Sequence, residues 1–168
     1  MPNWCANLLE VNGLVLNKLA FLESLHGEIV PTMAAGTNPS VITLTKIKPY
    51  PEGNWDYDWC VEHWGTKWDI EAELINRAWE GNDNLLIRFD SAWSPPEAAF
   101  RELPTMFPDL CFSHIYAESG MNYSGSDIYI GLNRDPDDGY NTWDFPATME
   151  GNIPSIVMAY IGMVGELD

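Results

Sequence analysis

The hydrophobic pattern at the start of the chain predicts a strand followed by a helix. Trp4–Val11 is a short apolar run closed by the turn signal Asn12-Gly13, which is typical of a strand. From 14 to 26, apolar residues recur at the spacing of one helix face, so we expect an amphipathic helix of about three turns. The residues of that face are Val15, Leu19 and Leu22. Gly27 then predicts a left-handed helix cap.

The pattern is less regular until residue 68. Residues 28–54 are rich in proline and glycine, and within them Val41–Ile47 predicts one strand. The aromatic and acidic segment 55–65 has no clear period. Trp68–Leu74 alternates strictly between apolar and acidic residues, as a strand with one buried and one hydrated face requires. A helix over Asp69–Glu80 is the alternative, and the unbroken alternation favours the strand.

A turn at 81–84 and a second strand, Leu85–Trp93, follow. We expect Arg88 and Asp90 on the polar face of this strand. The expected core face carries Leu85, Ile87, Phe89 and Trp93.

The segment Ser94-Pro95-Pro96-Glu97 has the composition of a capping box with proline in the first helical turn. It predicts a helix that ends near Pro104, because proline cannot continue the hydrogen-bond ladder. Two strands are predicted after it, and then an acidic loop and an apolar helix too short to span a bilayer. These elements are Leu110–Glu118, Asp127–Leu132, Asp135–Trp143 and Ile153–Val164.

The order strand, helix, strand, strand, helix, strand is that of a ferredoxin-like split βαβ fold. We therefore expect an α+β domain over 1–132, with an antiparallel sheet, helices on one face and an insertion at about 28–64 before the central hairpin. Residues 133–168 would form a C-terminal extension, in which an acidic loop precedes an apolar helix packed on the same domain.

The composition is that of an acidic globular protein. The 168 residues include 25 acidic and eight basic ones, for a net charge of −17, yet 46% are hydrophobic and 12% aromatic, which argues against disorder. Such a charge repels free nucleic acid and anionic lipid, so neither is an expected direct ligand. The three widely spaced cysteines do not indicate a disulfide scaffold, and we expect the cytoplasm of a bacterial host cell.

The charge is concentrated in one part of the sequence. Up to Tyr50 three acids balance three bases, whereas 22 acids and five bases follow from Pro51 onward. Seven of the eight tryptophans lie in this acidic part. A charged face that only keeps the protein soluble is the simpler interpretation. An anionic surface that attracts a basic partner is the sharper one.

Four short stretches carry a family resemblance. They are 2–7 (PNWCAN), 46–53 (KIKPYPEG), 64–69 (WGTKWD) and 89–96 (FDSAWSPP). With them the chain, from Pro2 to about Gly131, resembles the YubB-like proteins of plasmids and bacteriophages, which carry the ferredoxin-like domain described for Api-type phage proteins. The resemblance implies a ferredoxin-like fold and a mobile genetic element, and it implies no activity or catalytic residues.

Motifs for metal binding and catalysis are weak. Cys60 with His63 and Cys111 with His114 form two C-x-x-H pairs, but positions i and i+3 of a strand point to opposite faces, so we expect buried cysteines and surface histidines rather than zinc. The acidic segment 135–139 departs from calcium-loop spacing at its glycine and at Pro146, the twelfth position. A triad of Cys60, Glu62 and His63 is disfavoured because sequence neighbours point apart on an extended chain. No cofactor or metal site is expected.

An open ferredoxin-like sheet can also bind RNA by stacking bases on aromatic side chains. Five aromatic residues are available for this, but the basic residues that would hold phosphates are missing, so we expect these aromatics to lie in the core. They are Trp4, Trp68, Phe89, Phe112 and Tyr116.

The function that these features favour is that of a non-enzymatic interaction protein of a phage or plasmid. It would bind a basic, nucleic-acid-binding surface of a host protein and act as a DNA-mimicking inhibitor of host defence. Trp55 and Trp59 are the expected anchors. The expected partner-binding acids are Asp56, Asp58, Glu62, Asp69, Glu71, Glu73, Asp135, Asp137 and Asp138.

Two alternatives stay open. The first is a small-ligand or metal-binding enzyme with its site between the sheet and the insertion, where Lys67, between two tryptophans, would contact an anion. The same lysine could instead pack across tryptophan faces. The second alternative is a structural homo-oligomer formed through Ile153–Val164.

Overall fold

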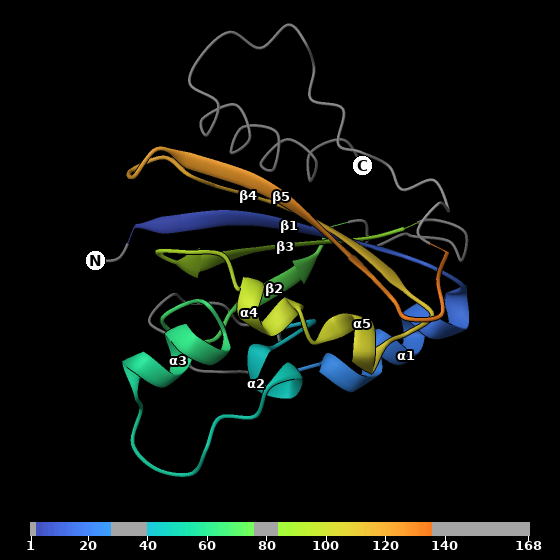
Figure 1. Ribbon diagram of the computed structural model, residues 1–168, viewed down its shortest axis with the longest axis horizontal. Helices are drawn as coiled ribbons and strands as arrows, with labels where there is room; N and C mark the ends of the chain where they lie inside the picture. Colours follow the sequence, from blue (N-terminus) through green and yellow to red (C-terminus); the bar gives the residue numbers. More distant parts are fainter. Residues whose placement is uncertain (1–2, 28–39, 76–83, 136–168) are drawn as a thin grey trace, which may run out of the picture.

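The fold is an antiparallel sheet of five strands with the helices on one side of it (Figure 1). The computed structural model describes residues 3–27, 40–75 and 84–135. The strands are β1 (Trp4–Asn12), β2 (Glu71–Leu74), β3 (Leu85–Ala92), β4 (Cys111–Glu118) and β5 (Tyr123–Ile130). The helices are α1 (Val15–Leu25), α2 (Leu44–Ile47), α3 (Tyr57–His63), α4 (Glu97–Phe100) and α5 (Leu103–Met106).

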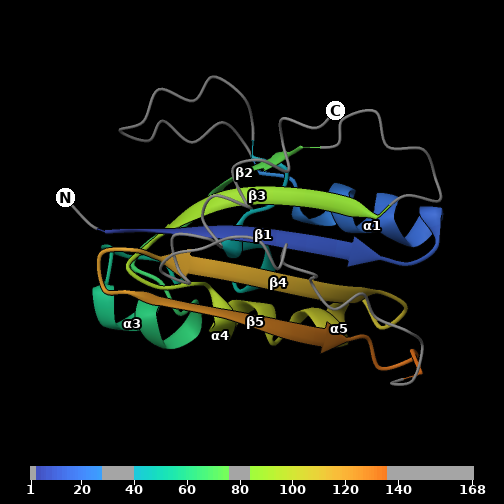
Figure 2. The ribbon, with the colours of Figure 1, turned by 90° about the horizontal axis from the view of Figure 1, so that it is seen from above.

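The sheet order is β2-β3-β1-β4-β5, and every neighbouring pair is antiparallel. β1 lies at the centre, where Leu9 stands opposite Ile87 of β3 and His114 of β4. The first four strands have the order of a ferredoxin-like split βαβ sheet, and β5 extends it beyond β4 (Figure 2). The expected α+β, ferredoxin-like fold is therefore confirmed. The expected helix Ile153–Val164 and the loop Asp135–Trp143 beyond its first residue lie outside the described residues.

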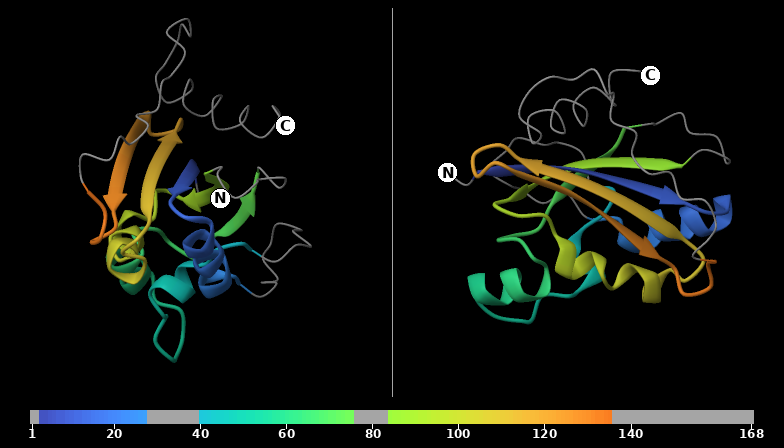
Figure 3. Two further views of the ribbon diagram at one scale, coloured as in Figure 1. Left: turned by 90° about the vertical axis from the view of Figure 1, so that its right-hand side faces the viewer. Right: turned by 45° about the horizontal axis from the view of Figure 1, so that its top comes forward.

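The strands alternate between two buried faces. Leu9 and Val11 of β1 belong to the large core under the helices, with residues such as Phe21, Ile87 and Phe100. The intervening Leu8 joins a smaller cluster on the opposite face, which also contains Ala6, Ile115 and Ala117. Figure 3 shows the described helices on the first of these faces. β1 is thus buried on both sides, which explains why its sequence is nearly continuously apolar.

The helix α1 confirms the predicted element, but of its predicted face only Leu22 packs against the core. Its buried residues are Lys18, Phe21 and Leu25, whereas Val15 and Leu19 are exposed. Two adjacent faces of this helix are largely apolar, so the spacing of apolar residues alone could not show which face is buried. The aromatic ring of Phe21 settles the orientation, since it packs 5.1 Å from the ring of Phe107 and 5.6 Å from that of Phe112.

Gly27 does not form the predicted left-handed cap, because its φ is not positive. The residue that ends α1 is His26, with a φ of −57°. A side chain at Gly27 would meet the side chain of Thr43, so glycine allows a close approach of two segments here. The predicted strand Val41–Ile47 is also wrong. Its second half is the helical turn α2, because Asp69 accepts hydrogen bonds from the free N–H groups of Leu44 and Thr45.

The predicted capping box is replaced by a tertiary contact. Ser94 donates its hydroxyl hydrogen bond to the carbonyl of Gly65 at 2.5 Å, and α4 has no side-chain cap. Pro104 does not end this helix but lies in the first turn of α5, where its missing N–H leaves no bond broken. Trp93 is not on the core face, because a φ of +71° turns its side chain outward and leaves it 40% exposed.

His114 lies in the middle of the core, which corrects the expectation of a surface histidine. Its Nε2 is 2.9 Å from Oδ1 of Asn7, whose Nδ2 donates to Cys5 and Ser91. The Asn7 oxygen must therefore accept, and the Nε2 of His114 must carry the proton. The rings of Phe100 and Phe89 flank the imidazole, whose Nδ1 has no hydrogen-bond partner among the residues that the structure describes.

This burial predicts a pH-dependent stability. Burial lowers the pKa of His114 from 6.5 to about 3. Between these two pH values the unfolded state therefore binds a proton on this imidazole and the folded state does not. The contribution of His114 to the free energy of unfolding is therefore independent of pH above 6.5, and it decreases as the pH falls from 6.5 toward 3. Urea unfolding at pH 7 to 4 should show a wild-type free energy of unfolding that falls faster than that of His114→Gln, by up to about 1.4 kcal/mol per pH unit. Parallel curves for the two proteins would contradict the assignment.

Candidate functional site

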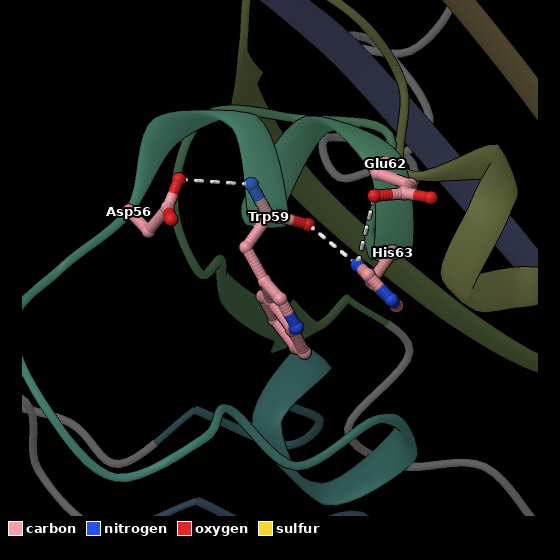
Figure 4. A network of polar contacts seen from close by, with 4 residues as sticks. All are labelled: Asp56, Trp59, Glu62 and His63. Atoms are coloured by element: carbon pink, nitrogen blue, oxygen red, sulfur yellow. Dashed lines mark hydrogen bonds and ion pairs between the residues drawn. The ribbon is translucent and has the colours of Figure 1, made fainter.

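The short helix α3 displays acidic side chains around an aromatic attachment. Asp56 caps the helix, since its carboxylate accepts a hydrogen bond of 3.1 Å from the N–H of Trp59 (Figure 4). At the other end, Nδ1 of His63 donates to the carbonyl of Trp59 at 2.9 Å and lies 4.0 Å from Glu62. Asp58 lies in the first turn, where a carboxylate interacts favourably with the helix dipole.

Trp59 attaches α3 to the rest of the domain. Its ring stacks on His63 with centroids 4.4 Å apart and meets the rings of Tyr50 and Trp64 edge-on. Trp64 in turn is buried and donates from its indole to the carbonyl of Lys48. The predicted anchor Trp59 therefore has intramolecular contacts of its own, whereas the other predicted anchor, Trp55, is 54% exposed.

Exposed aromatic and aliphatic groups accompany the acids of α3. The ring of Trp55 lies 6.3 Å from that of Tyr57, and both are about half exposed. We call the following group the α3 surface: Trp55, Tyr57, Asp58, Val61 and Glu62. It combines two carboxylates with apolar contact area, as protein-binding surfaces commonly do.

The carboxylate of Asp69, unlike those of Asp58 and Glu62, accepts hydrogen bonds within the domain and is not available to a partner. Its carboxylate accepts from the N–H groups of Leu44 and Thr45, from the hydroxyl of Thr45 and from its own neighbour Ile70, at 2.6 to 3.1 Å. These bonds join the start of β2 to the N-terminus of α2. The side chain thus has a structural role within the domain.

The acids of β2 lie on the other side of the sheet from α3. Glu71 and Glu73 pair with Asp90 and Arg88, which are in register with the strand positions of the smaller cluster rather than of the core under the helices. Glu73 also accepts two hydrogen bonds from the guanidinium of Arg88, at 2.6 and 2.9 Å. The predicted acidic residues therefore do not share one face.

The remaining predicted residues divide between described and undescribed parts. Asp135 is exposed at the end of the described chain, and Asp137 and Asp138 lie outside the described residues. The ammonium of Lys67 lies 4.5 Å from the ring centroid of Trp68, which itself contacts Trp4. The predicted packing of this lysine across a tryptophan face is thus present.

The cysteine and aromatic motifs are mostly buried. Cys60 and Cys111 are buried, and burial raises the pKa of the Cys60 thiol, which makes it a poor nucleophile. Within the described ranges no three metal-ligating side chains gather. Phe89, Phe112 and Tyr116 face the helices, whereas Trp4 is 46% exposed. Three of the five aromatics therefore lie on the face of the sheet that the helices cover, whereas Trp4, expected in the core, is in register with the opposite face.

A cavity of about 470 Å³ lies beside the α3 surface, and sequence reasoning missed it. It opens between α3, α4 and the hairpin of β4 and β5, segments far apart in the sequence. Its polar walls come from Glu62, Glu97, Arg101, Tyr116 and Tyr123. No local motif signals this cavity, because the sheet register alone brings the hairpin beside α4.

Two carboxyl groups lie close together beside this cavity, and one of them, that of Glu97, lines it. Glu97 of α4 lies within hydrogen-bonding reach of Asp127 of β5. Burial and the neighbouring Glu97 raise the pKa of Asp127, and the charge of Arg101 partly opposes the shift. Burial also raises the pKa of the adjacent Tyr116, whose hydroxyl faces Glu97. The site thus concentrates negative charge next to phenol groups that stay neutral.

One comparison with known proteins found a family. A family model described as "ferredoxin-like domain in Api92-like protein" matches residues 63–156, more than half of the chain. No curated protein and no solved structure matched significantly. Among the residues that the structure describes, no helix has the length and apolar character needed to cross a membrane.

The four bonds to Asp69 predict a stability effect. Asp69→Ala leaves the N-terminal N–H groups of α2 without their acceptor and should lower the free energy of unfolding by about 1–3 kcal/mol. Denaturant unfolding measures this loss, and Glu71→Ala, two residues along on the hydrated face, is the matched control with an expected change within about 0.5 kcal/mol. Equal effects of the two substitutions would show that Asp69 has no special role.

The carboxyl pair predicts a substitution that stabilises the protein. A carboxyl group whose pKa is raised by folding destabilises the folded state as the pH rises above the pKa of the unfolded chain, and fully above the raised pKa. Asp127→Asn should therefore increase the free energy of unfolding at pH 7. The gain should stay below about 1 kcal/mol, since the group is partly solvated, and should vanish near pH 4. Thermal unfolding at both pH values tests this, and a loss of stability at pH 7 would contradict the repulsion.

Proposed function

We propose that this chain, which belongs to the family of the ferredoxin-like domain in Api92-like protein, is a non-enzymatic interaction protein whose α3 surface binds a basic surface on another protein. The finer proposal is that it is a YubB-like protein of a phage or plasmid. Its partner would then be a nucleic-acid-binding protein in the cytoplasm of the bacterial host, inhibited by carboxylates in the place of DNA phosphates.

The exposure of the α3 acids beside exposed rings carries this proposal. Within the described residues, Asp58 makes no hydrogen bond or ion pair, and the side chain of Glu62 is 79% exposed. Trp55 and Tyr57 add apolar area at the same place. The net charge of −17 supports a basic partner, because complementary charge accelerates encounter and excludes acidic competitors.

The alternative of a small-ligand enzyme draws support from the cavity beside α3. Its wall is acidic, however, so it favours a cation over the anion that Lys67 was expected to contact. Lys67 itself packs on Trp68 and is not among the lining residues. We therefore prefer the interaction protein.

Neutralising the α3 acids should weaken partner binding. We expect the double variant Asp58→Asn, Glu62→Gln to bind a partner purified from a bacterial host about five- to tenfold more weakly, and with a smaller salt dependence, because two attractive charges are lost. Titration calorimetry at 50 and 300 mM salt measures both effects.

The matched control is Glu23→Gln, Glu71→Gln, which changes the net charge equally on α1 and on the opposite sheet face. Its affinity should stay close to that of the wild type. Equal weakening by both double variants would show that overall charge, not the α3 surface, attracts the partner.

A further inference from the structure

The cavity beside α3 is continuous with the α3 surface. Val61 and Glu62 belong to both, so a chain that binds the surface passes the cavity mouth. The opposite wall is formed by Tyr116 and Tyr123, whose ring centroids lie 6.4 Å apart. A partner at the α3 surface could therefore extend one side chain between these walls.

The aromatic wall depends on a glycine. Gly125 stands opposite Tyr116 in the register of β4 and β5, and a side chain there would collide with the phenol ring. The ring of Tyr116 can consequently lie across β5 toward the cavity. The hydroxyl of Tyr123 donates to the carbonyl of Trp93, which holds the second ring in place.

The negative charge of Glu97 and Asp127 is only weakly neutralised within the described residues. Oδ2 of Asp127 is buried and has no hydrogen-bond partner within the described residues. The nearest guanidinium is that of Arg101, whose Nη2 is 3.9 Å from Oε2 of Glu97, beyond hydrogen-bonding distance. The side chain of Arg101 is moreover 69% exposed, so the ion pair is a weak one.

We propose that this cavity receives an arginine side chain of the basic partner. Its guanidinium would donate to the carboxylate of Glu97, near the charge of Asp127, and pack against the rings of Tyr116 and Tyr123. Arginine fits this chemistry better than lysine because its planar group bonds to a carboxylate through two nitrogens and stacks on aromatic faces. The inference rests on the proposed function, and it names the group by which the partner is recognised.

The inference gives Arg101 a defined role. It is an internal competitor, since its positive charge already lies near the carboxylates that the incoming guanidinium would contact. Removing that charge should strengthen binding of an arginine, whereas removing the carboxylate of Glu97 should weaken it. A gain of affinity cannot come from unfolding, so Arg101→Gln tests the inference even if Glu97→Gln proves unstable.

The experiment titrates the full chain with the blocked tripeptide Gly-Arg-Gly, observed through the NMR signals of Tyr116 and Tyr123. The control peptide carries citrulline, which has the shape of arginine without its charge. We expect saturable shifts with the arginine peptide alone. Glu97→Gln should weaken binding at least fivefold and Arg101→Gln should strengthen it about threefold, whereas Asp58→Asn, outside the cavity, should leave it unchanged.

The outcomes separate this inference from the proposed function. The cavity inference would be overturned by absent shifts, by equal shifts with the citrulline peptide, or by unchanged or weaker peptide binding by Arg101→Gln. The α3 surface would still be supported if partner binding depends on salt and is lost with Asp58→Asn. Arginine-specific shifts without any partner that depends on the α3 acids would support the cavity and overturn the proposed function.

Discussion

The burial of β1 on both faces is the constraint on which the rest of the structure depends. Its odd positions, such as Leu9, contribute to the core under the helices, and its even positions, such as Leu8, contribute to the second cluster. A shift of one residue in register would exchange these two sets and place Asn7 on the wrong side. Because both neighbouring strands pair with β1, its register also determines where β5, and with it the cavity, lies relative to α4.

The acidic character of the chain is compatible with this core because the acids occupy different structural roles. Some carboxylates stabilise local structure, as Asp56 and Asp69 do by accepting backbone hydrogen bonds. Others, such as Glu73, are paired across strands. In the described part of the chain, Asp58 and Glu62 accept no backbone hydrogen bond and pair with no neighbouring strand, and they lie beside exposed rings. The net charge therefore says less about binding than the position of these two residues does.

Hydrophobic patterning predicted β1, β2, β3 and β4 and their order, since the positions on one face of a strand repeat every two residues. It placed the last strand at Asp127–Leu132, whereas β5 is Tyr123–Ile130, and it wrongly predicted a strand at Val41–Ile47. It failed where tertiary contacts decide: Phe21 selects the buried face of α1, and Gly65 rather than the α4 N–H groups engages Ser94. The helix α3 has no clear period because most of its residues are exposed and one ring, Trp59, makes much of its attachment. The acids of the site were identified from the sequence, but their division between two faces follows from the sheet register alone.

The cavity was beyond sequence reasoning for a related reason. Glu97 and Asp127 are 30 residues apart, and no motif links them; they lie close together because β5 adds to the edge of the ferredoxin-like sheet next to β4. An isolated carboxyl pair costs stability at neutral pH, since each charge raises the free energy of the other. A cation from outside, such as the guanidinium of the proposed partner, would reduce this cost. The added strand β5, which a four-stranded ferredoxin-like sheet does not need, thus supplies Asp127 and one wall of the cavity in which we propose that an arginine binds.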